Sequence, residues 1–345
     1  TVTLIPNDPP EWPVEASEQA LHMPHATDSA LLIYTSGTTG LPKGVLHSHA
    51  SLLAGGLNTA KAHQLTEDDR ALCVLSLCHI NGQVVTVMAP LVSGSSVVMP
   101  SRFSASNFWE TIADYKCTWF SAVPTILSYL VQSKEKLVPP SNEFSQLRFG
   151  RSASAPLPPA LLESFVTRFQ IPIVETMGIT ETAAQILSNP LDPAQQQVGS
   201  PGIPWGNDVR IANELGTTLS TGREGEIQVQ GPNLMKGYFK NEAATQESFT
   251  SDNWYRTGDL GWMNEDGYFF VTGRRKELII KGGENISPRE IDDVLYSHPA
   301  VLEAAAVAVP DSHYGQEIAA CVVTKPGESV TVDELHAFCV TRLGN

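Results

Sequence analysis

Short apolar runs alternate with longer segments of helical pattern along residues 30–190. The apolar runs cover residues 30–33, 71–77, 96–99, 118–122 and 171–175, and the clearest helical segments cover residues 107–115 and 160–169. Strands that alternate with helices along a chain are typical of a parallel sheet covered by helices. The sequence therefore predicts an α/β region with a largely parallel sheet over this part of the chain.

The pattern changes near residue 198 and again near residue 273. Strand-like runs at 209–211, 225–230 and 268–272 are separated by glycine turns, which predicts an antiparallel, β-barrel-like subdomain over residues 198–272. Further strand-like runs follow at 278–280, 301–309 and 318–324, with a helix that begins at Ser287 and has Pro288 and Glu290 in its first turn. We expect a large domain over residues 1–272 and a small α+β domain over residues 273–345.

The segment at residues 35–44, T-S-G-T-T-G-L-P-K-G, concentrates groups that bind anions. Its glycines allow the backbone to approach a ligand closely, its hydroxyls donate hydrogen bonds, and its lysine supplies a compact positive charge. The candidate phosphate-binding residues are Thr35, Ser36, Gly37, Thr38, Thr39, Gly40 and Lys43. The P-loop of nucleoside triphosphatases is excluded, because Pro42 and Gly44 stand where that motif needs a glycine and a hydroxyl residue. A flexible surface loop is the simpler alternative.

Composition describes an ordinary globular protein, with 42% hydrophobic and 17% charged residues among 345. The net charge of −15 and the pI near 5.0 argue against binding to a nucleic-acid backbone. Five cysteines without C-x-x-C spacing predict buried free thiols in a reducing compartment and no zinc site: Cys73, Cys78, Cys117, Cys321 and Cys339. No apolar run is long enough to span a membrane, and no signal peptide is expected. We expect a cytoplasmic protein, with the peroxisome or another organelle as the alternative.

Three further motifs each allow two interpretations. Thr180 and Glu181 follow the apolar run at 171–175, where a hydroxyl beside a carboxylate suits a phosphate with its magnesium ion, although a helix N-terminus is the simpler alternative. Asp259 follows a glycine, where it could accept hydrogen bonds from ribose hydroxyls or cap a turn. A surface basic patch would explain the arginines of the segment at 273–286, G-R-R-K-E-L-I-I-K-G-G-E-N-I, but not its glycines.

Together and in this order, these motifs resemble those of the adenylate-forming enzymes, which include acyl-CoA synthetases, peptide-synthetase adenylation domains and luciferases. The resemblance covers essentially the whole chain and implies that the loop at 35–44 holds the outer phosphates of ATP. It assigns Thr180 to a phosphate, Glu181 to Mg²⁺, and both Asp259 and Arg274 to the ribose. Lys276 takes the position of a hinge about which a small, mobile C-terminal domain rotates.

The resemblance also implies roles for residues that carry little signal by themselves. Ser154, Ala155 and Pro156 would line the adenine, and Met177 precedes Gly178 where the family often has an aromatic residue that stacks on it. Gly282, Gly283 and Glu284 would lie beside the pantetheine arm of CoA, and His79 would border the tunnel for carboxylate and thiol. Arg148 and Arg151 are expected to frame the adenine segment. The catalytic candidates are Lys43, His79, Thr180 and Glu181.

The implied reaction has two steps. A carboxylate attacks the α-phosphorus of Mg·ATP to give an acyl-adenylate and pyrophosphate, and a thiol then displaces AMP. The chain is most similar to carboxylate–CoA ligases of the oxalate and peroxisomal fatty-acid type, which implies ATP, Mg²⁺, CoA and a small-molecule acid as ligands. The alternatives are a domain that loads a carrier-protein thiol and a nucleotide-binding module without turnover. The acid cannot be identified from the sequence, but its pocket should lie near residues 79–85 and 174–184.

One element of the family's pattern is missing from the sequence. Members of the family carry a lysine near the C-terminus within P-x-x-x-x-G-K, whereas this sequence stops at Asn345 without such a segment. We therefore expect a truncated C-terminal domain and an incomplete first subdomain. The expected consequence is a chain that binds nucleotide but adenylates poorly.

Overall fold

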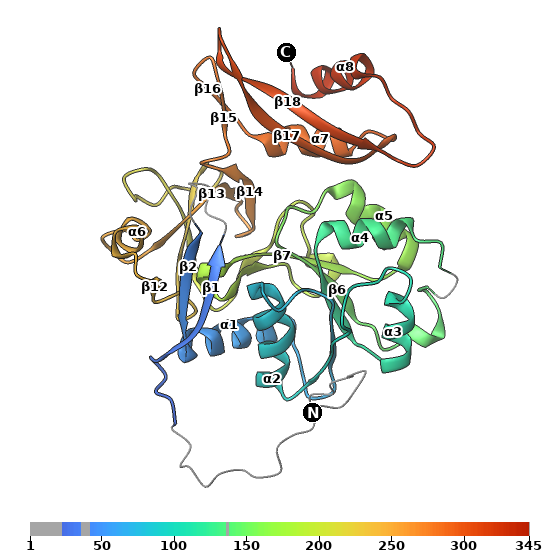
Figure 1. Cartoon of the computed structure of the whole chain (residues 1–345), viewed down its shortest axis with the longest axis vertical. Coiled ribbons are helices and arrows are strands. Elements are labelled where there is room, and N and C mark those ends of the chain that lie inside the picture. The colour runs from blue at the N-terminus through green and yellow to red at the C-terminus, as the bar shows by residue number, and fades with distance from the viewer. Residues whose placement is uncertain (1–22, 36–41, 136–137, 345) are drawn as a thin grey trace.

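The computed structural model describes residues 23–35, 42–135 and 138–344, and the strands in these ranges form four sheets (Figure 1). Three of the sheets lie in the part of the chain up to Arg274. The fourth sheet is formed by the strands that follow. The predicted fold class, an α/β region followed by an antiparallel region and a separate C-terminal unit, is confirmed.

The largest sheet has the strand order β4-β3-β5-β6-β7-β8-β9. The strands are β3 (Arg70–Cys73), β4 (Ser96–Val98), β5 (Trp119–Ala122), β6 (Phe149–Ser152), β7 (Ile173–Ile179), β8 (Ala184–Ser188) and β9 (Ile203–Pro204). The first five strands in that order are parallel, whereas β8 and β9 are antiparallel to their neighbours. The short 3₁₀ turn η3 (Thr180–Thr182) reverses the chain between β7 and β8. The parallel sheet is thus confirmed, and β8 is a strand that the apolar pattern did not predict.

Helices cover both faces of this sheet. One face carries α1 (His49–Ala62), the π-helical segment η1 (Asn81–Met88) and α2 (Ala89–Ser93), and the other carries α3 (Phe108–Tyr115), α4 (Pro124–Gln132) and α5 (Pro159–Phe169). The neighbouring residues Trp119 and Phe120 of β5 belong to different apolar clusters, the first with Val84 and the second with Trp109. A parallel strand that is buried on both faces forms a continuous apolar run, as seen in the sequence here.

Two antiparallel sheets complete the larger part of the molecule. One contains β1 (Ser29–Thr35), β2 (Lys43–Ser48) and β12 (Gly237–Tyr238), and the other contains β10 (Asp208–Ala212), β11 (Gly225–Gln230), β13 (Tyr255–Met263) and β14 (Phe269–Arg274). The short helical segments are η2 (Asn142–Phe144), η4 (Pro193–Gln195) and α6 (Glu242–Glu247). Ile227 and Phe269 pack with Leu187 of β8, so the four-stranded sheet adjoins the antiparallel edge of the large sheet. The subdomain expected over residues 198–272 takes this antiparallel form.

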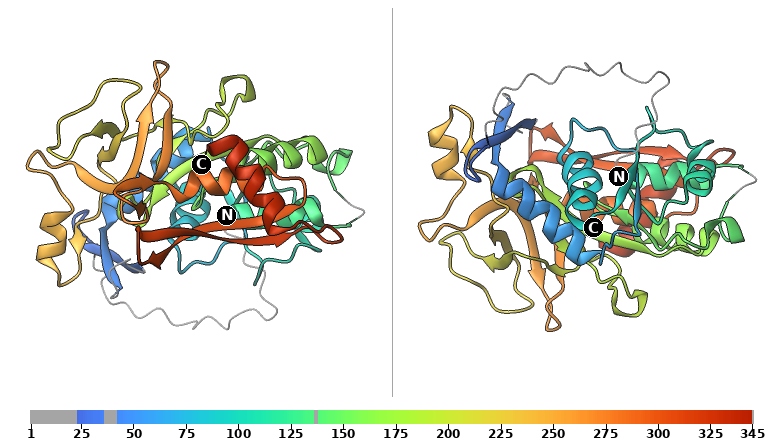
Figure 2. Two further views of the ribbon diagram at one scale, coloured as in Figure 1. Left: turned by 90° about the horizontal axis from the view of Figure 1, so that it is seen from above. Right: turned by 90° about the horizontal axis from the view of Figure 1, so that it is seen from below.

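The C-terminal part has its own sheet, in the order β16-β15-β18-β17. Its elements are β15 (Ile279–Lys281), β16 (Glu284–Ile286), α7 (Pro288–Tyr296), β17 (Val301–Asp311), β18 (Gly315–Thr324) and α8 (Val332–Leu343). Ser287 precedes α7 as expected, but its hydroxyl donates to the carbonyl of Thr272 rather than capping the helix. This hydrogen bond ties the start of α7 to β14. Figures 1 and 2 show the C-terminal sheet lying over the α/β region, with α7 on the side that faces it.

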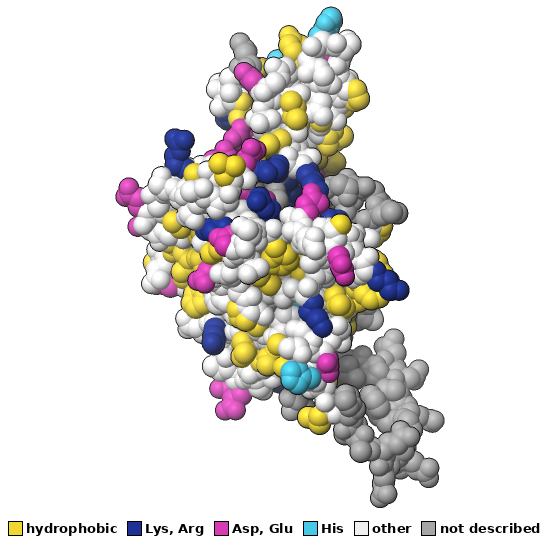
Figure 3. Space-filling view, turned by 90° about the vertical axis from the view of Figure 1, so that its left-hand side faces the viewer, with side chains coloured by type: hydrophobic (Ala, Val, Ile, Leu, Met, Phe, Trp, Pro, Cys, Tyr) yellow, Lys and Arg dark blue, Asp and Glu magenta, His cyan; other side chains and the backbone are white. Residues whose placement is uncertain are grey.

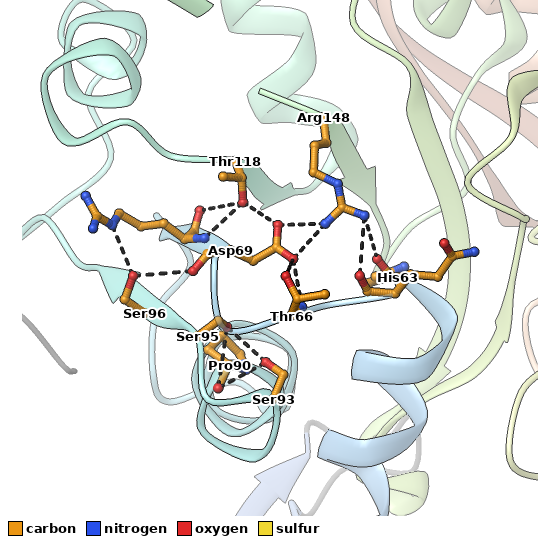
Figure 4. A network of polar contacts seen from close by, with 11 residues as sticks. His63, Thr66, Asp69, Pro90, Ser93, Ser95, Ser96, Thr118 and Arg148 are labelled. Carbon is orange, nitrogen blue, oxygen red and sulfur yellow. Dashed lines mark hydrogen bonds and ion pairs between the residues drawn. The ribbon is translucent and has the colours of Figure 1, made fainter. Parts of the chain in front are cut away.

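Arg148 lies at the end of β6 opposite to the predicted adenine segment. Its Nη1 contacts Asp69 Oδ1 at 2.6 Å, and Asp69 also accepts from Thr118 and Thr66 (Figure 4). Burial tends to raise the pKa of Asp69, but the hydrogen bonds from Thr118 and Thr66 and the charge of Arg148 lower it overall. The expectation that Arg148 frames the adenine is therefore wrong, because this arginine joins segments at the amino-terminal edge of the sheet.

The cysteines are free, but not all are buried. Cys73 and Cys117 are buried, as expected, whereas Cys78 and Cys321 are exposed. Cys321 lies on β18, where successive side chains point to opposite faces, and its neighbour Val322 packs in the C-terminal core instead. The apolar run around Cys321 thus predicted burial of the whole strand, whereas only one face of β18 packs against the core.

Candidate functional site

A cavity of about 380 Å³ lies where the larger part of the molecule meets α7. Seven of the residues predicted to bind the nucleotide line it: Ser154, Ala155, Pro156, Met177, Gly178, Asp259 and Arg274. They come from the loop after β6, from β7, and from the paired strands β13 and β14. The fold thus brings residues from four separate sequence motifs to one cavity. Figure 3 shows basic side chains gathered on the surface at the junction between the two parts.

The loop that follows β6 is held in an unusual backbone conformation. Ser154 has φ of 72°, in the left-handed region, and its Oγ accepts from Nδ2 of Asn81 at 3.2 Å. A non-glycine residue in this region carries strain, which is commonly found at ligand-binding loops. The serine therefore adopts a backbone conformation that glycine reaches more readily.

Strands β7 and β8 approach closely at Gly178. A Cβ atom placed on this residue would lie 1.8 Å from the carbonyl oxygen of Ala184, and the strand register shifts between Met177 and Gly178. Only glycine fits here without moving the backbone. The side chain of Met177 lines the cavity at the position that the family often gives to an aromatic residue.

Asp259 forms the polar wall of the cavity together with Arg274. The two residues are register partners on β13 and β14, and Arg274 Nε donates to Asp259 Oδ1 at 2.8 Å. Asp259 is 4% exposed, and its Oδ2 has no hydrogen-bond partner among the described residues. Burial raises the pKa of Asp259, although the charge of Arg274 opposes the shift. A buried carboxylate oxygen with no partner in a cavity wall fits a ligand that brings hydroxyl donors.

A second polar cluster lies just beyond Gly178, where Tyr238 contacts both Glu181 and Lys43. Oε1 of Glu181 accepts from the hydroxyl of Tyr238 at 2.9 Å, and Lys43 Nζ lies 4.8 Å from the centroid of the same ring. Burial, reinforced by the charge of Glu181, raises the pKa of Tyr238 to about 12, so this hydroxyl keeps its proton at neutral pH. The carbonyl of Thr180 accepts from Nε2 of the buried His47 at 2.7 Å. The turn that carries Thr180 and Glu181 is thus fixed from β2 and β12.

The central residues of the predicted phosphate loop, Ser36, Gly37, Thr38, Thr39 and Gly40, lie outside the described residues. The strands on either side of them are described. β1 ends at Thr35 and β2 begins at Lys43, and these two residues are antiparallel register partners. The predicted strand before the loop is present, and the chain continues into a second strand, whereas a P-loop would continue into a helix.

Four predicted residues lie elsewhere. His79 is exposed in the turn before η1 and is not among the residues that line the cavity. Gly282, Gly283 and Glu284 form the turn between β15 and β16, which points away from the larger part in Figure 1. Their assignments stay predictions.

Lys276 lies in an exposed turn between β14 and β15, where the chain passes from the larger part into the C-terminal sheet. Its role as a hinge also stays a prediction.

The structure adds three residues that the motifs did not reveal. Glu175, Arg289 and Asp293 line the cavity, and the last two come from α7. Burial raises the pKa of Glu175 to about 8, although Arg289 opposes the shift. The only signal in the sequence was Glu175, a charged residue at the end of an apolar run. Its place in the cavity became clear only because α7 packs opposite β7.

No group of three or more His, Cys, Asp or Glu side chains that could hold a metal lies within the ranges that the structure describes. Glu181 alone therefore has to be tested as a magnesium ligand. Mg²⁺ is usually held by one or two carboxylates together with substrate phosphates and water. Glu181 follows Thr180 in the chain and shares a contact to Tyr238 with Lys43, which fits that arrangement because a threonine and a lysine both suit phosphate oxygens.

The chain belongs to the AMP-binding enzyme family. The family model described as AMP-binding enzyme matches residues 2–239, and the model described as AMP-binding enzyme C-terminal domain matches residues 290–345. The resemblance seen in the sequence is thereby confirmed.

Curated relatives and solved structures agree with this assignment. The sulfoacetate–CoA ligase of Cupriavidus necator is 53% identical over 321 residues, covering 93% of this chain and 62% of the relative. The oxalate–CoA ligase of Arabidopsis thaliana is 39% identical over 322 residues, covering 92% and 62%. The chain thus spans about 62% of the length of these relatives.

Among solved structures, ATP-bound MatB from Rhodopseudomonas palustris superimposes with a TM-score of 0.86 at 31% identity, covering 93% of this chain and 63% of that chain. MenE from Bacillus subtilis in complex with ATP and magnesium gives a TM-score of 0.83 at 34% identity, covering 96% and 67%. No helix in the described ranges has the length and apolar character needed to cross a membrane.

Proposed function

We propose that this chain is the nucleotide-binding part of an ATP-dependent carboxylate–CoA ligase that works through an acyl-adenylate and releases AMP and pyrophosphate. The observation that carries the proposal is the buried Oδ2 of Asp259, which has no partner among the described residues and lies in the wall of a cavity that Arg274 and Gly178 also line. Membership of the AMP-binding enzyme family and the CoA ligases among its relatives support the same activity.

Each part of the nucleotide has a candidate partner. Ser154, Ala155, Pro156 and Met177 would surround the adenine, and Asp259 would accept from the ribose hydroxyls beside Arg274. Lys43 and Thr180 would contact the phosphates, together with the loop at 36–40. Glu181 would hold Mg²⁺, which when bound neutralises phosphate charge and orients the phosphates.

CoA requires a second arrangement of the two parts in this proposal. Gly282, Gly283 and Glu284 lie at the turn of the β15–β16 hairpin and do not line the cavity. A rotation about the turn at Lys276 would carry this loop toward the acyl group, which is the reason to propose the turn as the hinge between residues 1–272 and 273–345.

The acid and the acceptor define the alternatives. The acids named for the two curated relatives, sulfoacetate and oxalate, each carry two acidic groups. A small carboxylic acid is therefore the proposed substrate. A carrier-protein thiol in place of CoA, or nucleotide binding without turnover, are the competing functions.

Titration calorimetry with AMP and ATP tests the nucleotide site, and CoA-dependent AMP release with a panel of short acids tests the reaction. Replacing Asp259 with Asn should weaken AMP binding about 10- to 100-fold, since hydrogen bonds to a buried charged group are lost. The matched control is Asp266→Asn in the exposed turn before β14, which should bind AMP like the parent chain. Equal AMP affinity in both variants would refute the ribose assignment.

The same assay separates the three functions. AMP release that depends on CoA supports the ligase, and release that depends on a phosphopantetheinylated carrier protein supports the loading domain. AMP binding without release under either condition would favour the module without turnover.

A further inference from the structure

Arg151 is a buried cation with no acidic partner. It lies on β6, is 1% exposed, and its Nη1 donates only to the neutral acceptors Asn81 Oδ1 and Ser121 Oγ, both at 3.1 Å. Its Nε has no hydrogen-bond partner, and no carboxylate among the described residues lies within ion-pair distance of the guanidinium. A buried charge without a counterion is costly, so a protein that retains one usually pairs it with something.

The arginine nevertheless stays charged at neutral pH. Burial lowers the pKa of Arg151 to about 9, which is still above the pH of a neutral solution. The guanidinium therefore presents a positive charge and at least one free donor to the interior. A planar guanidinium matches a carboxylate or sulfonate oxyanion better than it matches neutral acceptors.

Arg151 does not line the nucleotide cavity itself but is joined to its wall by hydrogen bonds. Its register partners on the neighbouring strands are Ser121 and Val174, so these side chains share the sheet face that η1 covers. Asn81, the first residue of η1, joins Arg151 to Ser154 at the cavity wall. The two segments in which the sequence places the acid, residues 79–85 and 174–184, thus lie on either side of this arginine.

The winding of η1 is a second observation at the same place. Its eight residues, Asn81–Met88, are π-helical, and π-helical turns are frequently found at functional sites. Gly82 is required there, since a Cβ atom would lie 2.5 Å from the carbonyl oxygen of Ser76. The close approach of Gly82 to Ser76 fixes the start of η1, where Asn81 accepts from the guanidinium.

We propose that Arg151, with Asn81 and Ser121, binds a second oxyanion of the acid, so that the substrates are short acids with a carboxylate or sulfonate in addition to the reacting carboxylate. This inference rests on the proposed function, because it names the substrate class of the same site. The reacting carboxylate faces the nucleotide cavity, and the second anion faces β6. Acids without a second anion leave the buried charge unpaired.

The test compares acids that differ only in the charge of the far end. Sulfoacetate, oxalate and malonate are paired with methylsulfonylacetate, oxamate and malonamate, respectively. The affinity for each acid is measured by calorimetry in the presence of AMP, and turnover is measured as ATP-dependent pyrophosphate release. In at least one pair the doubly charged acid should bind about 10- to 100-fold more tightly. Arg151→Gln should remove the preference while AMP affinity stays unchanged, and Arg151→Lys should restore part of it.

A second variant tests the same inference in case Arg151→Gln does not fold. Asn81→Asp supplies an internal carboxylate to Arg151 and should abolish the preference in a folded chain, because the internal anion competes with the ligand. Equal binding within all pairs, no binding of any acid, or an unchanged preference in a folded variant overturns the inference. A preference in binding without pyrophosphate release overturns the proposed ligase activity instead and leaves the anion site standing.

Discussion

At the scale of single residues, the buried carboxylates of Glu175 and Asp259 line the same cavity, and each keeps one oxygen without a partner among the described residues. The two carboxylates have different charged neighbours. Asp259 is paired with Arg274 on the adjacent strand, whereas Glu175 faces Arg289 and Asp293 of α7. The proposed ribose contact therefore stays with Asp259, and Glu175 is a buried titrating group between the two parts of the molecule.

Glu175 should make the stability of the fold fall as pH rises. Its pKa is raised from the usual 4.5 to about 8, so the folded state holds a proton that the unfolded state has already lost between those values. The stabilisation is complete below pH 4.5 and disappears as pH rises through about 8. Glu175→Gln should therefore shrink the difference between the urea midpoints at pH 5.5 and pH 8.

The control for this prediction is Glu163→Gln on the exposed side of α5, which should keep the pH dependence of the parent chain. The same dependence in Glu175→Gln as in the parent would show that this carboxyl does not hold the proton.

Residues in contiguous motifs could be predicted from sequence, and isolated ones could not. Asp259 and Arg274 each stand in a recognisable motif, and the structure pairs them. Tyr238 has no motif, yet it joins Glu181 and Lys43, because β12 pairs with β2 far from it in the sequence. The prediction that Arg148 frames the adenine was wrong for the same reason, because its partner Asp69 lies before β3, far from it in the sequence.

At the scale of elements, β7 organises the site. It contributes Glu175, Met177 and Gly178 to the cavity and leads into the turn with Thr180 and Glu181. The apolar run revealed only its first half, because the second half, residues 176–179, is interrupted by Gly178, where β7 approaches β8 closely.

Gly178→Ala should destabilise the fold by about 1–3 kcal/mol, since the added Cβ would overpack backbone that has no space to move. AMP binding should weaken as well, because β7 would have to shift beside the cavity. Urea unfolding and AMP titration measure the two effects. Gly56→Ala in α1 is the comparison, as its Cβ would lie 3.2 Å from Met88, a distance that a small adjustment relieves, and alanine favours the helix. Similar losses in the two variants would contradict the close-approach argument.

Element prediction succeeded where a local pattern decides the structure. Strand β11 has the bounds read from the sequence, Gly225–Gln230, because glycine turns bracket an alternating run. Segment η1 was not recognised, since its apolar residues do not distinguish a π-helix from an α-helix or a strand. Strand β8 begins at Ala184, and both Ala184 and the preceding Ala183 have positive φ, a conformation that the presence of alanine does not predict.

At the scale of the whole molecule, the chain passes once from the larger part to the C-terminal sheet, through the exposed turn at Arg275 and Lys276. Around that crossing, Ser287 and Arg289 of the α7 region donate to the carbonyls of Thr272 and Val271. A few hydrogen bonds and a ligand cavity thus join the two parts, and nucleotide binding should tighten the connection.

Trypsin should cleave in the turn after Arg275 or Lys276, and AMP should slow that cleavage, because a bound ribose would hold Arg274 and Asp259 in place. Mass spectrometry identifies the fragment that begins after the turn. Cleavage after the exposed Lys134, which does not line the cavity, is the internal control and should proceed at the same rate with and without AMP. Protection of both sites to the same extent would contradict a local effect.

The sequence alone determined the order of the motifs, the α/β alternation and the family, because short-range spacing and residue type carry all three. Only the tertiary structure decided which polar atoms remain unpaired and which cavity they face. Burial and pairing depend on segments far apart in the chain, as with Arg151 between β5 and β7 or Glu175 opposite α7. For that reason the residues that line the cavity could be predicted from their motifs, whereas the anion site proposed beside it rests on contacts that only the folded chain makes.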